Sequence, residues 1–161
     1  MSIDCLRANL AELDQLPANS FTGAVCLFGT LGMLVGDAAR RRCLLGVQRL
    51  LVPGGRLVVH VHNRWHGLTQ PGGRAWLAAS LWRYLTRGEP LGDRICPAHQ
   101  GLGRLRMHLF SRRSITRLLR ECGLRVTRLV PVGLRADGRL AWPWLAASVR
   151  AQGYLISAQR D

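Results

Sequence analysis

The chain contains no lysine. All 23 of its basic residues are arginines, against 9 acidic residues, which gives a formal charge of +14 over 161 residues. A surface selected to bind nucleic acid normally uses both basic side chains, so arginine alone, beside abundant Leu, Ala and Gly, indicates the codon bias of a GC-rich genome. A charge this high still favours polyanions without specificity. An arginine-rich nucleic-acid-binding module therefore stays open as an alternative.

Paired cysteines and long apolar runs are also lacking. The 5 cysteines form no CxxC pair, which argues against a disulfide framework or a zinc site and predicts a reducing, cytoplasmic environment. No apolar run reaches the roughly 18–20 residues that a membrane span needs, and the best one, Leu140–Val149, contains Pro143. The polar start, Ser2–Asn9, is unlike a signal peptide. We expect a single domain over residues 1–161, with no membrane contact and no metal.

Residues 21–63 predict a strand, a helix and a second strand. The apolar runs are Ala24–Phe28 and Leu57–Val61, and the helix is Ala38–Leu51 with Asp37 as its N-cap. Two buried strands joined by a helix form a right-handed crossover and a parallel sheet. We expect the helix to turn Leu44, Leu45, Val47 and Leu51 to the sheet, and Arg40, Arg41, Arg42 and Arg49 to solvent.

Ligands of parallel sheets bind outside the carboxyl ends of the strands. That rule places Phe28-Gly29-Thr30 and His62-Asn63 on one rim of the sheet. We therefore expect the function of this chain to reside at this rim.

The rest of the chain continues the α/β pattern. Ser111 or Ser114 is expected to cap a helix that Gly123 closes. The predicted elements are a strand at Ile3–Arg7, a helix at Ala75–Leu85, a loop over residues 87–103, a helix at Ser111–Cys122, and strands at Leu124–Val132 and Tyr154–Ala158.

Four phrases in order resemble a class I S-adenosylmethionine-dependent methyltransferase of the type 11/25-like group. They are LAELDQLPANSFTGAVCLFGTLGML, RLLVPGGRLVVHVHN, LFSRRSITRLLRECGLRVTRLVPV and GYLISAQR. They are similar to the third-strand exit with the fourth strand, the fifth strand, the last long helix with the sixth strand, and the final antiparallel strand. The resemblance implies an incomplete Rossmann-like sheet with the fourth to seventh strands, a possible third strand at Ile3–Arg7, and helices on both faces.

Three features of that family are absent. The glycine-rich loop after its first strand is missing, as is the acidic residue that ends its second strand, and Thr22 stands where an Asp is usual. GLG at 101–103 neither follows a clear strand nor opens a helix, so it is no substitute. In the family order 3-2-1-4-5-7-6 the missing strands lie beside the fourth, so Ala24–Phe28 is expected to be an open, apolar edge that pairs with other chains. We expect a truncated or degenerate domain that is inactive alone.

The resemblance also implies roles for individual residues. Asn9 would meet the adenine amino group of the S-adenosylmethionine cofactor while Leu10 packs on the ring, although an ordinary turn explains Asn9 as well. Phe28, Gly29 and Thr30 would line the methionine end, with Phe28 open to a plain core role. His62, Asn63 and Trp65 would face a small-molecule methyl acceptor. Trp65, Trp76 and Trp82 suggest an apolar lining of the acceptor lid, although a plain core role explains them as well.

His62 is the candidate catalytic base, because the imidazole pKa lies near neutrality. His60 shares its strand face, a spacing that suits metal, but no third ligand is evident. Three hypotheses follow: a small-molecule methyltransferase, a nucleic-acid module using Arg113, Arg117 and Arg120, and a non-catalytic remnant that pairs its open edge.

Overall fold

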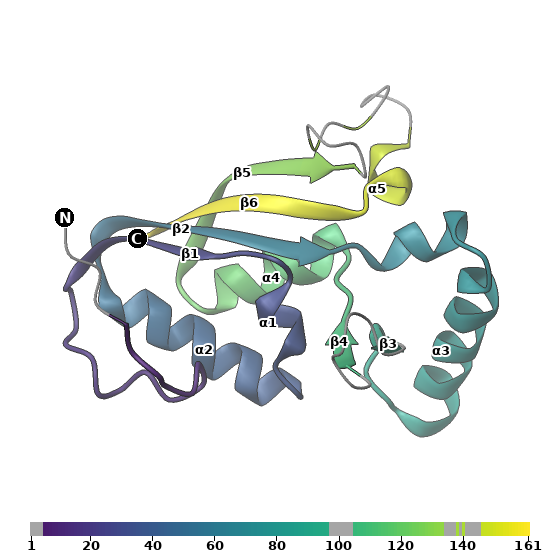
Figure 1. The fold of residues 1–161 in the computed structure, drawn as a ribbon, viewed down its shortest axis with the longest axis horizontal. Coiled ribbons are helices and arrows are strands. Elements are labelled where there is room, and N and C mark those ends of the chain that lie inside the picture. Colours follow the sequence, from purple (N-terminus) through teal and green to yellow (C-terminus); the bar gives the residue numbers. More distant parts are fainter. Residues whose placement is uncertain (1–4, 97–104, 134–137, 139, 141–145) are drawn as a thin grey trace.

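A four-stranded sheet forms the frame of the molecule. The computed structural model describes residues 5–96, 105–133, 138, 140 and 146–161. The strand order is β1 (Phe21–Cys26), β2 (Leu51–His62), β6 (Gly153–Arg160) and β5 (Leu124–Val132) (Figure 1). β1 and β2 are parallel, while β6 is antiparallel to both of its neighbours. This is the order expected for the fourth, fifth, seventh and sixth strands, so the α/β fold class predicted from the sequence is confirmed.

The crossover from β1 to β2 contains two helices, α1 (Thr30–Met33) and α2 (Asp37–Leu50). The short helix α1 was not predicted from the sequence. Gly36, with φ at 86°, is the N-cap of α2. Asp37 lies inside the first turn, where it binds Arg40, so the prediction that Asp37 is the N-cap was wrong.

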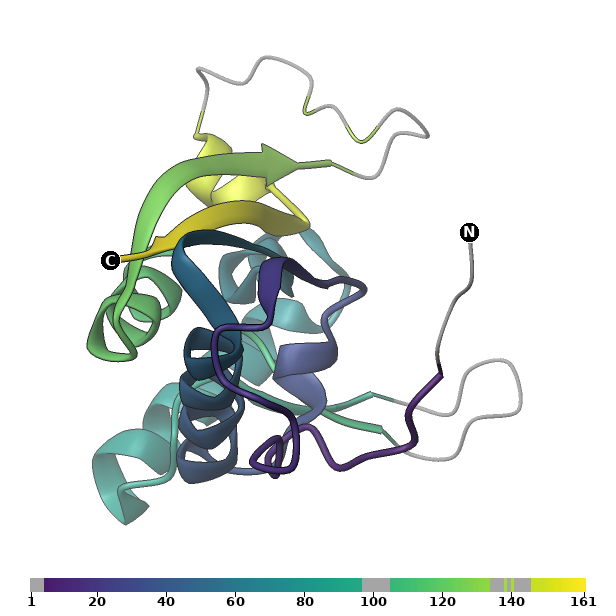
Figure 2. The same cartoon turned by 90° about the vertical axis from the view of Figure 1, so that its left-hand side faces the viewer.

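One hydrophobic core fills the space between the sheet and its helices. α2 and α4 (Arg112–Glu121) lie on the same side of the sheet (Figures 1 and 2). The inward side chains belong to one cluster: Cys43 and Leu44 of α2, Leu57, Val59 and Val61 of β2, Ile115, Leu118 and Leu119 of α4, and Tyr154, Ile156 and Ala158 of β6. Burying this apolar surface contributes about 25 cal/mol per Å². We expected helices on both faces of the sheet. Among the described residues, the long helices that pack on the sheet, α2 and α4, lie on the same face.

Two side chains of α2 depart from the predicted faces. Leu45 is 49% exposed, and Arg40 is 1% exposed. The Arg40 guanidinium points back along the helix, where it donates to the carbonyl of Leu34 and to Asp37. The prediction that Arg40 faces solvent was therefore wrong. Its charge can be buried because these local acceptors compensate the loss of water.

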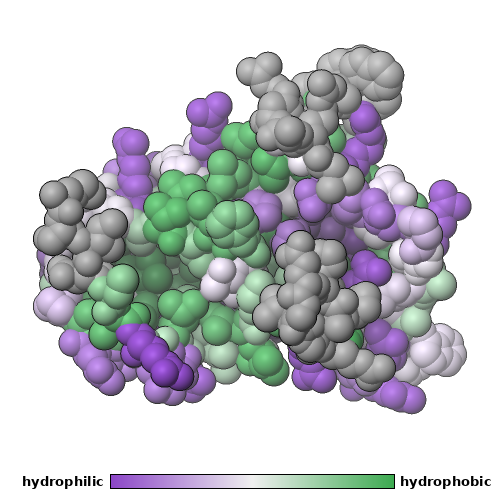
Figure 3. Space-filling view, in the orientation of Figure 1, coloured by the Kyte–Doolittle hydropathy of each residue, from purple (hydrophilic) through white to green (hydrophobic). Residues whose placement is uncertain are grey.

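The other face and the β1 edge expose apolar side chains. β1 has a strand neighbour on one side only within the described part of the chain. Val25 is 69% exposed, and Phe21, Leu27 and Leu155 are exposed as well. Figure 3 shows hydrophobic side chains gathered on this side, in the region of β1 and α1. The open, apolar edge expected from the sequence is present.

The segment between β2 and α4 forms an arm beside the sheet (Figure 1). It contains the 3₁₀ helix η1 (Arg64–Thr69), α3 (Gly73–Arg87), β3 (Asp93–Cys96) and β4 (Leu105–His108). The expected helix at 75–85 is confirmed and is longer. The expected loop at 87–103 was wrong for residues 93–96, because β3 pairs with β4, a partner that a local pattern does not show. Residues 97–103, including the GLG sequence, lie outside the described part.

The C-terminal elements follow the prediction closely. Ser111 caps α4 in a capping box with Ser114, and Gly123, with φ at 72°, follows the helix. β5 has the predicted bounds, and β6 is longer than predicted. The short helix α5 (Ala147–Arg150) precedes β6.

The N-terminal segment runs along α2 instead of joining the sheet. Arg49 donates to the carbonyls of Leu13 and Leu16, and Leu13 packs against Gly46. The strand expected at Ile3–Arg7 begins outside the described residues, and residues 5–7 form no strand. No neighbouring strand is described there to supply hydrogen bonds, which is the physical reason for the difference.

Candidate functional site

The rim after β1 is a tight left-handed turn. Phe28 and Gly29 have φ of 56° and 74°, and the amide and hydroxyl of Thr30 both donate to the carbonyl of Leu27. Such φ values are uncommon for residues other than glycine, and strained backbone of this kind gathers at functional sites. The Phe28 side chain is 82% exposed. The alternative that Phe28 is a core residue is therefore wrong.

Gly29 lies directly against His62. A Cβ atom on Gly29 would be 2.5 Å from Cδ2 of the His62 ring, which is too close for any side chain. The glycine thus lets the β1 rim approach the end of β2. The structure brings these two predicted site residues together, at the carboxyl ends of two parallel strands.

His62 is placed to remain neutral. Burial lowers the pKa of its imidazole, and the neighbouring His60 and His66 lower it further. The His60 and His62 rings meet edge to face, with centroids 5.1 Å apart. A neutral imidazole can accept a proton, which is what a general base must do.

Asn63 holds the rim together from inside. It is 2% exposed, its amide nitrogen donates to the carbonyls of Ser148 and Ala151, and its oxygen accepts from the amide of Trp65. The backbone around it is fixed as well, since the Phe110 amide donates to the carbonyl of His62 and the Arg64 amide to that of Phe110. Both amide protons of Asn63 are therefore occupied by protein acceptors.

A cavity of about 260 Å³ opens at the end of β2. Its lining comes from four elements and the loops between them: His62, Asn63, His66, Gly67, Gln70, Arg94, Met107, Leu109 and Gln152. Among the described lining residues, Arg94 alone carries a fixed charge. The cavity is slightly smaller than typical small-molecule sites, which hold about 300–1,000 Å³.

Most of these lining residues were missed by sequence reasoning. His66 follows His62 by four residues, a spacing that the sequence offers as a signal. Arg94 and Met107 arrive on the β3–β4 hairpin, in or beside the region predicted as loop. Gln152 arrives from the far end of the chain, where its carbonyl accepts from the amide of Asn63.

None of the three tryptophans expected at the acceptor lid lines this cavity. Trp65 is half-exposed, and the guanidinium carbon of Arg64 lies 5.0 Å from the centroid of its ring. Trp82 is exposed. Neither is part of the cavity lining. Trp76 packs on the cavity residue Arg94, whose guanidinium carbon lies 5.4 Å from the ring centroid. One tryptophan of the three therefore supports the site, through Arg94.

Asn9 and Leu10 are both exposed and lie in a local turn. Asn9 accepts from the amide of Ala11 and donates to Glu12. Within the described residues, no hydrogen bond links this turn to the rim. Its role toward adenine stays a prediction.

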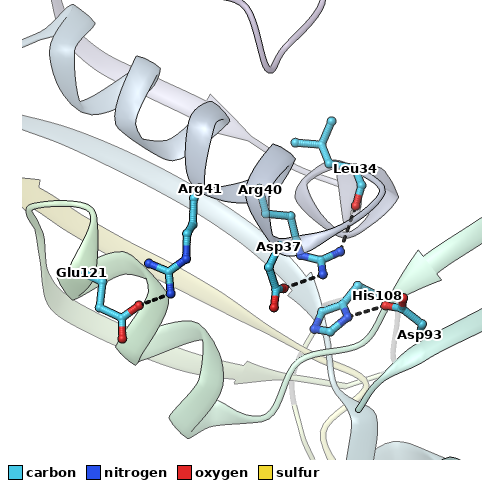
Figure 4. A network of polar contacts seen from close by, with 7 residues as sticks. All are labelled: Leu34, Asp37, Arg40, Arg41, Asp93, His108 and Glu121. Carbon is cyan, nitrogen blue, oxygen red and sulfur yellow. Dashed lines mark hydrogen bonds and ion pairs between the residues drawn. The ribbon is translucent and has the colours of Figure 1, made fainter. Parts of the chain in front are cut away.

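A buried polar network supports the hairpin that carries Arg94 (Figure 4). Nδ1 of His108 lies 2.6 Å from Oδ1 of Asp93, and a Cβ on Gly32 would be 2.6 Å from the His108 carbonyl oxygen, so the hairpin packs tightly on α1. Burial lowers the pKa of His108, and Asp93 opposes that shift. On the other side of α2, Arg41 pairs with Glu121 and joins α2 to α4.

Within residues 5–96, 105–133, 138, 140 and 146–161, no group of three or more His, Cys, Asp or Glu side chains is arranged to hold a metal ion. No helix in the same residues is long and apolar enough to cross a membrane.

No protein-family model matches this sequence, and no curated protein matches it either. The structure, however, is similar to solved methyltransferases. A Methanosarcina mazei S-adenosylmethionine-dependent methyltransferase aligns over 95% of this chain with 20% identity and a TM-score of 0.69. A Thermotoga maritima S-adenosylmethionine-dependent methyltransferase, described as a possible histamine N-methyltransferase, aligns over 97% with 16% identity and a TM-score of 0.59.

A third similar structure contains bound ligands. The Burkholderia thailandensis 1,6-didemethyltoxoflavin-N1-methyltransferase, solved with its substrate and S-adenosylhomocysteine, aligns over 94% of this chain with 16% identity and a TM-score of 0.51. The chain spans 65%, 63% and 48% of the lengths of these three proteins. These similarities establish the fold, a partial Rossmann-like sheet of the kind found in S-adenosylmethionine-dependent methyltransferases.

Proposed function

We propose that this chain forms the acceptor-side part of an S-adenosylmethionine-dependent methyltransferase that acts on a small molecule. The observation that carries the proposal is the contact between Gly29 and His62 at the carboxyl ends of parallel strands, beside the cavity of about 260 Å³. The fold of the similar structures supports it.

The rim fits the methionine end of that cofactor. Gly29 leaves backbone bare beside His62, and Phe28 and Thr30 flank it. The cofactor supplies an electrophilic methyl group when bound. The sequence holds no glycine-rich loop for the rest of the cofactor, and Asn9 and Leu10 are proposed to meet its adenine.

His62 then acts on the acceptor. An acceptor oxygen or nitrogen must lose a proton as it takes a methyl group, and a neutral imidazole can accept that proton. The lowered pKa keeps His62 neutral at pH 7. Arg94 is the fixed charge in the cavity lining, which favours a neutral or anionic acceptor over a cationic one. Trp65 is proposed to contact the acceptor from the rim, while Asn63 fixes the backbone beneath it.

The open side of the sheet is expected to weaken cofactor binding by this chain alone. Within the described residues β1 presents an unpaired edge, and its outer face carries exposed Val25 and Phe21. We propose that the catalytic unit is completed against this surface, on the same or another polypeptide. The 161 residues alone are then expected to bind weakly and to be inactive or slow.

The test measures weak binding residue by residue. S-adenosylhomocysteine is titrated into isotope-labelled protein while backbone amide signals are followed by NMR. We expect the signals of Gly29, Thr30 and His62 to shift. Gly29→Ala should abolish these shifts, because its Cβ would be 2.5 Å from the His62 ring.

Gly72→Ala is the matched control for this experiment. Gly72 has φ of 70°, close to the 74° of Gly29, but nothing lies within 4 Å of its added Cβ. Both variants bear the same backbone cost, about 1–2 kcal/mol. Binding that survives in Gly72→Ala and is lost in Gly29→Ala supports the rim. Wild-type signals that do not move, or that move only elsewhere, contradict the proposal and favour a non-catalytic remnant.

A further inference from the structure

A hollow lined by arginines lies away from the rim, between α4 and β5. It encloses about 480 Å³ and is lined by Arg112, Thr116, Arg120, Leu124, Arg125, Val126, Leu129 and Asp161. We call these residues the α4–β5 groove. No part of the proposed methyl-transfer site lines it.

The helix presents its arginines to this groove as a row. Arg112, Thr116 and Arg120 are spaced four residues apart, so they share one face of α4. A rise of 1.5 Å per residue spreads Arg112 and Arg120 over about 12 Å along the helix. A single small anion would not engage both ends of this row.

Of the three arginines in the groove, Arg125 has an acidic partner among the described residues and the other two have none. Nε of Arg125 donates to Asp161 over 2.9 Å, and its Nη2 donates to Gln159. Arg112 and Arg120 have no carboxylate partner among the described residues, and both are exposed. Asp161 is the single acidic residue among the described residues of the lining. The groove therefore keeps net positive charge that is free to bind a ligand.

The floor of the groove indicates what kind of anion fits. It is built from Leu124, Val126 and Leu129, and among the described residues no aromatic side chain lines it. Bases bound by single-strand-binding proteins normally stack on aromatic rings. A ligand here would thus be held through its repeating phosphates and not through its bases.

We propose that the α4–β5 groove binds the phosphodiester backbone of single-stranded nucleic acid, independently of sequence. Arg112 and Arg120 contact separate phosphates along the strand, and Arg125 contacts the strand from the β5 side. This binding is separate from the proposed methyl transfer. It also differs from the helix face expected from the sequence, because Arg113 and Arg117 are not part of the groove.

The salt dependence of binding tests the proposal. A fluorescein-labelled oligothymidylate is titrated with the full chain at several salt concentrations, and binding is followed by anisotropy. Each phosphate neutralised on a single strand contributes about −0.7 to the slope of log K against log salt. Losing two contacts should therefore reduce the slope by about 1.4 in magnitude.

Two double variants of one helix separate the groove from overall charge. Arg112→Gln with Arg120→Gln removes two groove arginines, and Arg113→Gln with Arg117→Gln removes the same charge from α4 outside the groove. All four side chains are exposed, so both variants should fold, which circular dichroism checks. We expect a weaker affinity and a shallower slope in the groove variant and the wild-type slope in the control.

Three outcomes would overturn the proposal. Equal losses in both variants would mean that only net charge matters, and no loss in either would exclude the groove. Groove-dependent binding to phosphatidylserine vesicles without binding to the oligonucleotide would assign the groove to lipid headgroups instead.

Discussion

Arg40 shows how a single residue can hold a charge inside this fold. Its guanidinium is 1% exposed and bonds Asp37 over 2.6 Å and the Leu34 carbonyl over 2.9 Å. The next residue, Arg41, pairs with Glu121 on the surface, where about half of each side chain is open to solvent. Two adjacent arginines thus form ion pairs in contrasting environments.

We expect the two pairs to differ in their contribution to stability. Arg40→Ala should lower the free energy of unfolding by about 2–3 kcal/mol, since it leaves a cavity and unpaired acceptors. Arg41→Ala should cost under about 1 kcal/mol, as exposed ion pairs usually do. Urea unfolding of both variants measures the difference. Equal losses would contradict the role given to burial.

The buried histidines predict how stability depends on pH. Burial lowers the pKa of His60, His62 and His108 below the value of 6.5 that an unfolded histidine has. Below pH 6.5 the unfolded chain therefore binds more protons than the folded one, and the stability present above pH 6.5 is lost as pH falls through the folded pKa values. The carboxyl of Asp37 titrates at lower pH, since Arg40 lowers its pKa from 3.8.

Urea unfolding at a series of pH values from neutral to mildly acidic checks this expectation. The free energy of unfolding should decline with falling pH, and His62→Asn should make the decline shallower. His66→Asn should also make the decline slightly shallower, because His66 is one of the groups that lower the pKa of His62. A stability that is flat or rises toward acid would contradict the burial of these imidazoles.

At the scale of elements, the sequence correctly predicted the strands, helices and caps that depend on residues close together in the chain. The Leu124–Val132 strand, the Ser111 cap and the β1–α2–β2 crossover depend on residues close in sequence. The β3–β4 hairpin was missed because its pairing joins Asp93 to His108 across a segment with no strand periodicity. The fold class followed from the order of such elements.

The candidate site was only partly predictable for the same reason. Gly29 and His62 were found because parallel strands bring their carboxyl ends to one rim. Arg94 and Gln152 were missed because they lie far from β2 in the sequence. The β3–β4 hairpin brings Arg94 to the cavity and the end of α5 brings Gln152, and the sequence pattern of β2 predicts neither. The inward position of Arg40 likewise depends on a turn of the chain at Leu34.

At the scale of the whole molecule, net charge and exposed apolar surface have opposite effects on self-association. The formal charge of +14 repels other copies of the chain, and salt screens that repulsion. The β1 edge, which has no strand partner in the described part of the chain, and its exposed apolar side chains favour association. We therefore expect self-association to increase with salt and with protein concentration.

Val25→Lys should suppress this association. It places a charge on the open edge strand, at a side chain that is 69% exposed, so the folded monomer should tolerate it. Leu85→Lys is the matched control, since Leu85 is 70% exposed but lies on α3, far along the chain from the edge. Light scattering coupled to size exclusion, at low and high salt, measures the mass of each variant. A wild-type mass that stays monomeric at high salt, or an equal effect of both lysines, would show that the β1 edge does not drive contacts between copies.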